Sequence, residues 1–215
     1  MHYNLHTHNY SGNNNILEVV NVYPYEEIND IPYFSTGIHP WYIDAGNVEE
    51  QLSIIENRLQ MPNCLALGEC GLDKRIEIPL WVQIPVFEKQ LLLAIKYQKP
   101  VILHLVAAFQ ELIEIKKRLQ PDVPMIIHGF SKNTQVAKQL LNNGFYLSFG
   151  KYLLRNPELS EVFANVPEDR FFLETDTIEE GLEQVYEKAA LARNMSIQEI
   201  ENIVCNNFKT VFKNG

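Results

Sequence analysis

The chain has 215 residues, a length that suits one domain built around a single hydrophobic core. Its formal net charge of −9 argues against tight, sequence-independent binding to nucleic acid, because neutralising phosphates requires clustered Lys and Arg. The same charge is compatible with a nuclease that meets its substrate through metal ions and a local basic rim.

Eight strand-like runs occur along the chain. Most are continuously apolar rather than alternating, as expected of parallel strands that are covered on both faces. In chain order they are Tyr3–His8, Ile16–Tyr25, Tyr33–His39, Cys64–Glu69, Val101–His104, Met125–His128, Phe145–Phe149 and Arg170–Thr175.

Amphipathic helices are predicted mainly between the later strands, with recognisable start and stop signals. They are a helix capped by Asn47 with Glu50, a helix with Pro85 in its first turn, Ala107–Leu119, a helix from a Ser131 cap to Gly144, the segments Pro157–Asn165 and Glu179–Asn194, and a C-terminal helix with a Ser196–Glu199 capping box.

This alternation predicts an α/β fold, a TIM-type (β/α)8 barrel formed by residues 1–215 as a single domain. Seven residues separate His8 from Ile16, and a similar number separates the second and third strands. A crossover between parallel strands usually needs about a dozen residues or more. We therefore expect the first two helices to be missing or replaced by loops.

Six potential metal ligands stand at the downstream ends of five of these strands: His6, His8, Glu69, His104, His128 and Asp176. Parallel strands bring such ends to one mouth, where barrel enzymes hold catalytic metals. His6 and His8 are two positions apart on a strand and so share a face. Taken alone, that pair equally fits two solvent-facing histidines near a terminus.

The other candidates also have alternative interpretations when each is taken singly. His104 and His128 both follow three apolar residues, which also fits hydrogen-bonded core histidines. A buried Glu69 carboxylate is costly without a cation. Together, a bridging Glu with imidazoles on either side is typical of a two-metal hydrolytic centre that activates water. We find no serine or cysteine nucleophile motif, P-loop or dinucleotide-binding pattern.

Cysteine usage and the N-terminal sequence bear on location. An odd count of three cysteines suits a reducing compartment, and no cationic and apolar leader is present. No uncharged apolar run reaches about 18 residues, so no membrane span is expected. These features predict a cytoplasmic protein. Cys70, beside Glu69, is either a reactive thiol or, as we favour, a buried structural cysteine.

The ordered motifs resemble the TatD family of metal-dependent deoxyribonucleases, within the amidohydrolase-like barrels. The likeness extends from Asn4 to about Phe212. It includes Leu-His-Thr-His at 5–8, Gly-Ile-His-Pro at 37–40, Gly-Glu-Cys-Gly-Leu-Asp at 68–73, Gln83 to Gln90, Pro-Val-Ile-Leu-His at 100–104, His-Gly-Phe-Ser at 128–131, Tyr-Leu-Ser-Phe-Gly at 146–150, Glu-Thr-Asp at 174–176 and Asn207.

The resemblance implies a role for each candidate. His6, His8, Glu69 and Asp176 would hold one metal, and Glu69, His104 and His128 a second. Asp176 would also accept the proton of the attacking water. His39 would lie near a phosphate as a positioning group or proton donor; a turn residue fixed by Pro40 is an equal alternative.

Three residues depart from the family pattern. Asn4 stands where an Asp is usual, and an amide cannot supply its charge, which predicts weaker metal binding. Val106 replaces an Arg that could bind phosphate through two hydrogen bonds. Ile178 replaces a Pro.

Basic and aromatic residues near the strand ends are candidates for substrate contact. Lys74, Arg75, Lys132 and Lys151, the last together with Arg155, follow the proposed catalytic strand ends. They either replace the missing arginine or form a solvated rim. Trp41 and Tyr42 could stack on a base or cover the space left by the missing helices.

These features predict a hydrolase with two divalent metal ions (zinc, manganese or magnesium) that uses a metal-activated water to cleave phosphodiesters of DNA or smaller nucleotides. One alternative is a hydrolase of a small amide, lactone or carboxylic ester. Another is a metal-binding protein without catalytic activity, an alternative suggested by the departures from the family pattern at Asn4 and Val106. No membrane partner is expected, and the sequence predicts no oligomeric state.

Overall fold

The computed structural model describes residues 1–177 and 180–212, and all eight predicted strands are present in it. The paired strands run parallel, and the order of the strands in the sheet is their order in the chain. They are β1 (His2–Thr7), β2 (Ile16–Asn21), β3 (Phe34–Thr36), β4 (Cys64–Asp73), β5 (Val101–Val106), β6 (Met125–Ile127), β7 (Tyr146–Phe149) and β8 (Phe171–Leu173).

Several strand ends differ from the prediction, and His8 lies just beyond the end of β1 at Thr7. β4 continues four residues beyond Glu69 to Asp73, and every one of its residues is buried. β6 ends at Ile127, so His128 lies in the following loop rather than in the strand. β2 also ends early, at Asn21, three residues before a proline that cannot donate to a strand ladder.

The helices of the described residues follow the predicted pattern from the third strand onward. They are the 3-10 turn η1 (Pro40–Tyr42), α1 (Val48–Leu59), α2 (Leu80–Tyr97), α3 (Phe109–Leu119), α4 (Thr134–Asn142), α5 (Lys151–Arg155), α6 (Pro157–Ala164), the 3-10 turn η2 (Glu168–Arg170), α7 (Leu182–Arg193) and α8 (Ile197–Val211). The predicted start of α7 at Glu179 lies outside the described residues.

Two of the predicted helix caps lie where expected, and one does not. Asn47 is the N-cap residue of α1, but its side chain makes no capping hydrogen bond, and its amide donates to Asp44. The cap of α4 is Asn133, whose Oδ1 accepts from Val136 N at 3.1 Å, rather than Ser131. The Ser196–Glu199 capping box is present as predicted.

α2 also begins earlier than expected. It starts at Leu80, so Pro85 lies inside the helix rather than in its first turn. The missing helices of the first third are confirmed: residues 8–15, between β1 and β2, and residues 22–33, between β2 and β3, contain no helix.

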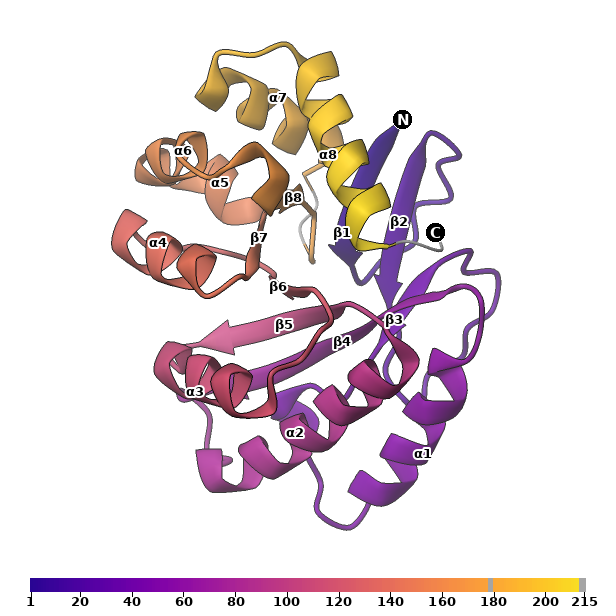
Figure 1. Cartoon of the computed structure of the whole chain (residues 1–215). Helices are drawn as coiled ribbons and strands as arrows, with labels where there is room; N and C mark the ends of the chain where they lie inside the picture. Colours follow the sequence, from indigo (N-terminus) through magenta and orange to yellow (C-terminus); the bar gives the residue numbers. More distant parts are fainter. Residues whose placement is uncertain (178–179, 213–215) are drawn as a thin grey trace. The chain divides into compact units, whose positions relative to one another are not determined.

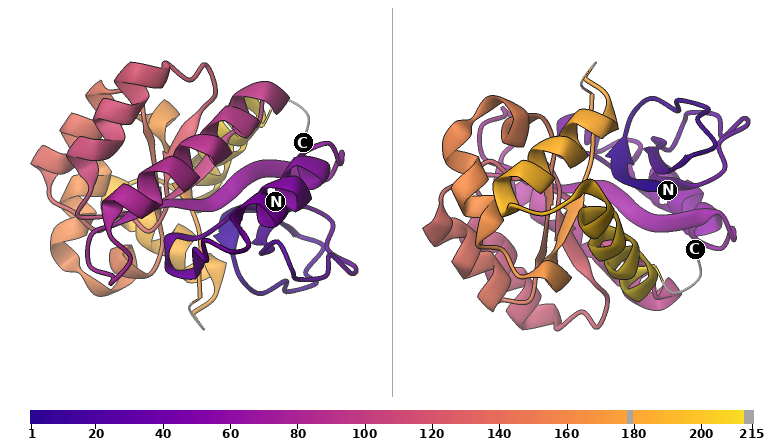
Figure 2. Two further views of the ribbon diagram at one scale, coloured as in Figure 1. Left: turned by 90° about the horizontal axis from the view of Figure 1, so that it is seen from below. Right: turned by 90° about the horizontal axis from the view of Figure 1, so that it is seen from above.

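The chain divides into two compact units. We call Met1–Val20 together with the chain from Ile127 onward the terminal unit, and Asn21–Ile126 the central unit. In the central unit α1 and α2 pack on β4 and on each other, as Figures 1 and 2 show in violet and purple. Its core includes the fully buried Phe34, Ile55 and Phe87.

The close approach of β4 to β5 requires glycine at two positions of β4. A Cβ on Gly71 would lie 2.0 Å from the carbonyl oxygen of His104, and one on Gly68 would lie 2.4 Å from that of Ile102. Both glycines have φ between +130° and +150°, a region that L side chains rarely adopt. Gly68 and Gly71 therefore let β4 carry Glu69 directly alongside β5.

In the terminal unit the yellow helix α8 packs against β1 and β8, and α7 packs on the same two strands (Figure 1). Tyr186 of α7 is fully buried, donates its hydroxyl to Tyr3 O and accepts from Tyr3 N, both at 3.0 Å. Phe208 and Phe212 stack beside Tyr3. These contacts hold β1 in place, and β1 carries His6.

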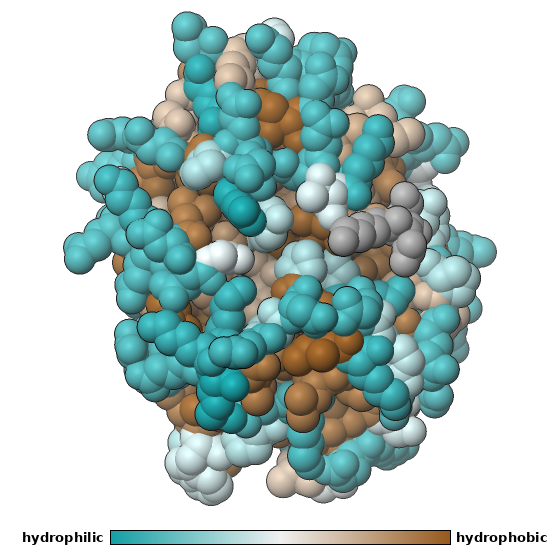
Figure 3. Space-filling model, viewed as in Figure 1, coloured by the Kyte–Doolittle hydropathy of each residue, from teal (hydrophilic) through white to brown (hydrophobic). Residues whose placement is uncertain are grey.

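The outer face seen in Figure 3 is mostly hydrophilic, with apolar side chains showing between the polar ones. This agrees with the charged fraction of 21% and the acidic balance of the sequence. Among the described residues, none of the helices has the length and apolar character that crossing a membrane requires.

Candidate metal centre

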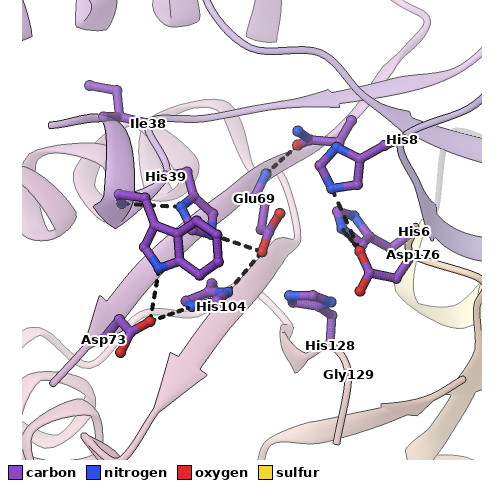
Figure 4. Close-up of polar contacts among 12 residues, drawn as sticks. His6, His8, Ile38, His39, Glu69, Asp73, His104, His128, Gly129 and Asp176 are labelled. Atoms are coloured by element: carbon purple, nitrogen blue, oxygen red, sulfur yellow. Dashed lines mark hydrogen bonds and ion pairs between the residues drawn. The ribbon is translucent and has the colours of Figure 1, made fainter. Parts of the chain in front are cut away.

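His6, His8 and Asp176 form one cluster, in the terminal unit. His6 Nε2 lies 3.9 Å and His8 Nε2 lies 3.7 Å from Asp176 Oδ1. The two imidazoles meet edge to face, with ring centroids 5.1 Å apart. Figure 4 shows both rings directed at the carboxylate. The sequence-based expectation that these three residues lie together is thus met within this unit.

The backbone explains why Asp176 faces these histidines. Its N–H donates to His6 O at 2.9 Å, and its carbonyl accepts from His8 N at 3.1 Å. Its φ is +57°, in the left-handed region, where Asp is among the better tolerated non-glycine residues. β8 itself ends at Leu173, so a local turn rather than the strand aims the carboxylate.

His128 also lies in the terminal unit, where its side chain contacts a different carboxylate, that of Glu174. Its ring centroid lies 4.5 Å from that of His6. Its Nδ1 lies 3.3 Å from Glu174 Oε1, which also accepts from Gly129 N at 2.7 Å. Glu174 is completely buried. A buried carboxylate on one ring nitrogen typically fixes the orientation of a histidine that binds a metal.

The central unit holds a second cluster, formed by His39, Glu69 and His104. Glu69 Oε1 lies 2.9 Å from His104 Nδ1 and 3.1 Å from His39 Nε2. His39 Nδ1 accepts from Trp41 N at 3.1 Å, which assigns the ring proton to Nε2. His39 therefore caps the η1 turn and faces Glu69.

Asp73 supports this second cluster. Its Oδ2 lies 3.2 Å from His104 Nε2 and accepts from Trp41 Nε1 at 2.8 Å, and its Oδ1 accepts from Arg75 N at 2.8 Å. Burial raises the pKa of the Asp73 carboxyl, but these hydrogen bonds outweigh burial and hold the pKa below its ordinary value. Asp73 therefore presents a carboxylate to His104, on the side opposite Glu69 (Figure 4).

The donor set fits divalent metal ions. One cluster consists of His6, His8 and Asp176, and the other of His39, Glu69 and His104. Within each cluster, every residue offers one nitrogen or oxygen atom, and these three atoms lie within 4.8 Å of one another. Imidazole and carboxylate together are ligands that suit zinc and manganese.

The predicted basic residues have different environments. Lys151, at the start of α5, places Nζ 3.2 Å from Asp176 Oδ2. Lys74 is paired at 2.5 Å with Glu111 of α3, and Arg75 is exposed. Lys132 is partly exposed in the loop after β6. Of these four, Lys151 is the one that the structure brings to a predicted metal ligand.

Asn4, the first departure from the family pattern, has a clear structural role. Its Oδ1 accepts from Thr175 N at 3.0 Å, and its Nδ2 donates to Thr175 Oγ1 at 2.9 Å and toward Glu18 Oε1 at 3.5 Å. Glu18 is buried. A carboxylate at position 4 would repel that of Glu18, whereas an amide satisfies both neighbours. Val106 is the last residue of β5, and Ile178 lies outside the described residues.

Two carboxylates beside the candidate ligands were not assigned a role from the sequence. Asp73 is four residues after Glu69, so strand alternation puts both on one face of β4, a signal that was available. Glu174 stands two residues before Asp176, but its pairing with His128 depends on the path of the loop after β6, which no local pattern reveals.

Comparison with known families agrees with this geometry. A family model described as TatD related DNase matches residues 4–213. The chain belongs to the TatD family.

Relatives of this chain include bacterial proteins that are named as a metal-dependent hydrolase and as an exonuclease. The chain is 30% identical over 202 residues to the uncharacterized metal-dependent hydrolase YabD of Bacillus subtilis, covering 86% of this chain and 78% of the relative. It is 31% identical over 156 residues to a protein of a Rahnella species named 3'-5' ssDNA/RNA exonuclease TatD, covering 70% of this chain and 59% of the relative.

The fold agrees with that of a solved TatD structure. The TatD homologue YjjV of Escherichia coli superposes with a TM-score of 0.78 at 25% sequence identity, covering 91% of this chain and 86% of that chain. With eight parallel strands in chain order, this similarity confirms the TIM-type barrel fold that the sequence predicted.

Proposed function

We propose that this TatD family protein is a divalent-metal-dependent hydrolase that cleaves phosphodiester bonds of DNA or smaller nucleotides. The observation that carries the proposal is the pair of clusters, each with two imidazoles around one carboxylate, His6 and His8 at Asp176 and His39 and His104 at Glu69. The name of the Rahnella relative, a single-stranded DNA and RNA exonuclease, supports a nucleic acid substrate.

The proposed ligand set is the one that the sequence resemblance predicts. One ion would be held by His6, His8, Glu69 and Asp176, and a second by Glu69, His104 and His128. When bound, the ions supply Lewis acidity and lower the pKa of water. Asp73 and Glu174 serve as the outer carboxylates that orient His104 and His128.

The protein's own side chains carry the proton transfers. Asp176 would accept the proton of the attacking water, and Lys151 Nζ lies 3.2 Å from its Oδ2. His39 carries its proton on Nε2, facing Glu69, and is the proposed proton donor. Glu69, Asp176 and His39 are therefore the proposed catalytic residues.

Lys151 is also the strongest of four proposed substrate contacts, with Lys74, Arg75 and Lys132 as the others. Its ammonium faces Asp176 and would take the role of the arginine that Val106 replaces. K151A should raise KM for a nucleotide diester about tenfold, since a charge-assisted hydrogen bond contributes about 1.5–3 kcal/mol. K138A, on the exposed face of α4, is the matched control. An unchanged KM in K151A removes Lys151 from the substrate site; K74A and K132A test the other lysines in the same way.

The experiment that tests the function is a hydrolysis screen of metal-reconstituted protein. Native protein, E69Q and the exposed control E187Q are loaded with zinc, manganese or magnesium, and their metal content is measured. We expect native protein and E187Q to cleave a DNA oligonucleotide, and E69Q to lose both metal and activity. A rate confined to a carboxylic ester or lactone would replace the nuclease by the alternative hydrolase. No turnover with two metals bound would favour a metal-binding protein without catalysis.

We further propose that residues 1–215 act as a single barrel domain in the cytoplasm. One cooperative thermal transition, measured by circular dichroism and by calorimetry, is the expected outcome for a single domain. Two separate transitions would instead mean that the terminal and central units unfold independently.

A further inference from the structure

Trp41 is an exposed aromatic residue that the structure nevertheless fixes in place. Its side chain is 54% exposed, although burying an indole is strongly favourable. Its Nε1 donates at 2.8 Å to Asp73 Oδ2, and Asp73 is 2% exposed. A buried carboxylate therefore holds the indole at the surface, where it covers little of the core.

The surroundings of Trp41 are those of the candidate metal centre. Its ring meets that of His104 at a centroid distance of 5.7 Å and an interplanar angle of 76°, and that of His39 at 5.0 Å and 85°. The next residue, Tyr42, is 55% exposed and lies against Tyr23 at 5.2 Å. Two exposed aromatic side chains thus flank the cluster that contains Glu69.

We propose that Trp41 is a base-stacking subsite, which binds the nucleobase next to the phosphate that this centre acts on. This inference rests on the proposed function and narrows its substrate class to nucleotides and single-stranded nucleic acid, whose bases are open to stacking. Every base has an aromatic face, so the subsite tolerates all four bases. An acidic chain of net charge −9 has little general attraction for nucleic acid, and stacking supplies affinity without added positive charge.

The hydrogen bond from Trp41 to Asp73 connects this subsite to the cluster of candidate metal ligands. Asp73 also contacts His104, so the indole N–H, the carboxylate and the imidazole form one chain. Two substitutions separate the parts of this arrangement. W41F retains an aromatic face but removes the N–H donor, whereas W41L removes both.

The test is a fluorescence titration in a W81F background. Trp81, 76% exposed on α2, is the only other tryptophan, so W81F leaves Trp41 as the sole indole. The metal-loaded protein, excited at a wavelength selective for indole, is titrated with dAMP and with 2-deoxyribose 5-phosphate. We expect dAMP to quench Trp41 saturably and to bind about tenfold more tightly than the sugar phosphate, because base stacking on an aromatic side chain contributes about that much.

The variants use calorimetric titration with the same two probes. W41L should bind dAMP and the sugar phosphate equally, W41F should keep most of the preference, and W81L should match the native protein. Circular dichroism melts confirm that each variant is folded. Equal binding of the two probes by native protein overturns the proposal, as does a preference for dAMP that survives in W41L.

Failure of this proposal differs from failure of the proposed function. If a trinucleotide is cleaved, and versions with an abasic sugar at either end are cleaved equally well, the phosphodiesterase stands and the subsite falls. If no trinucleotide is cleaved but W41L still abolishes the dAMP preference, the subsite stands and the phosphodiesterase falls.

Discussion

His104 Nε2 lies 3.2 Å from Asp73 Oδ2, while Nδ1 of the same ring faces Glu69. In the proposed centre the Nε2 proton would be donated to Asp73, and Nδ1 would be the metal donor. D73N should weaken binding of the metal at His104 by about 10- to 100-fold, as loss of an outer carboxylate typically does. Competition with a chromophoric chelator measures this affinity. D169N, at a mostly exposed carboxylate, is the control, and equal affinities in D73N and native protein would contradict the assigned role.

The pairing of Asn4 with Glu18 predicts how the family's usual residue behaves in this chain. N4D places a second carboxylate beside Glu18 and removes a donor to Thr175, so the free energy of unfolding should fall by about 1–3 kcal/mol. Adding E18Q removes the repulsion and should restore part of the loss. Urea denaturation of the native protein and the three variants gives the coupling energy. Additive effects would mean that the two side chains do not interact.

Gly71 should not accept a side chain. Alanine there would place Cβ 2.0 Å from His104 O at a φ of +147°, so G71A should lower the free energy of unfolding by about 1–3 kcal/mol or more. G46A is the matched control, since its Cβ would lie at an ordinary 3.5 Å from Asp44 Oδ1. Thermal melts of both variants decide the matter; equal melting temperatures would show that β4 and β5 can separate without cost.

The Cys64 and Cys70 thiols should not react with thiol reagents below pH 9 in folded protein. Burial raises the pKa of the Cys64 thiol from 9.0 to about 12, and burial likewise raises that of Cys70. A thiol reagent at pH 8 should modify at most Cys205 in folded protein and all three cysteines in urea. Rapid labelling of Cys70, located by mass spectrometry, would restore the reactive-thiol interpretation.

The same thiols give stability a defined pH dependence. Above about pH 9 the unfolded chain releases protons that folded Cys64 and Cys70 retain. Ionisation therefore stabilises the unfolded state relative to the folded state. Their contribution to stability is therefore complete below pH 9 and declines as the pH rises toward 12. Urea denaturation at pH 8 and pH 10 should show this decline, and a C64A variant should show less of it.

The sequence predicted the strands well because parallel, doubly covered strands are short continuous apolar runs, and it predicted the missing helices because short connections cannot cross over. Helix caps were harder. Asn47 stands at the start of α1, yet its amide donates to Asp44 and its side chain makes no capping hydrogen bond, while Asn133 rather than Ser131 caps α4. Such choices between neighbouring polar groups depend on local geometry.

The types of metal ligand in the site were predictable from the sequence, but the neighbouring residues that orient these ligands were not. The position of Asp176 depends on a left-handed turn that is hydrogen-bonded to the backbone of His6 and His8, and that of His128 on a buried Glu174. Each involves partners distant in sequence, so no local spacing reveals it. Asp73 is the exception, since its alternation with Glu69 on β4 was visible.

Diffraction from crystals grown with manganese can locate the ions of the proposed two-metal centre through their anomalous signal. We expect two anomalous peaks per chain, one with ligands from His6, His8, Glu69 and Asp176 and one with ligands from Glu69, His104 and His128. Peaks absent from these residues, or a single ion that leaves His104 and His128 bound only to Asp73 and Glu174, would contradict the proposal.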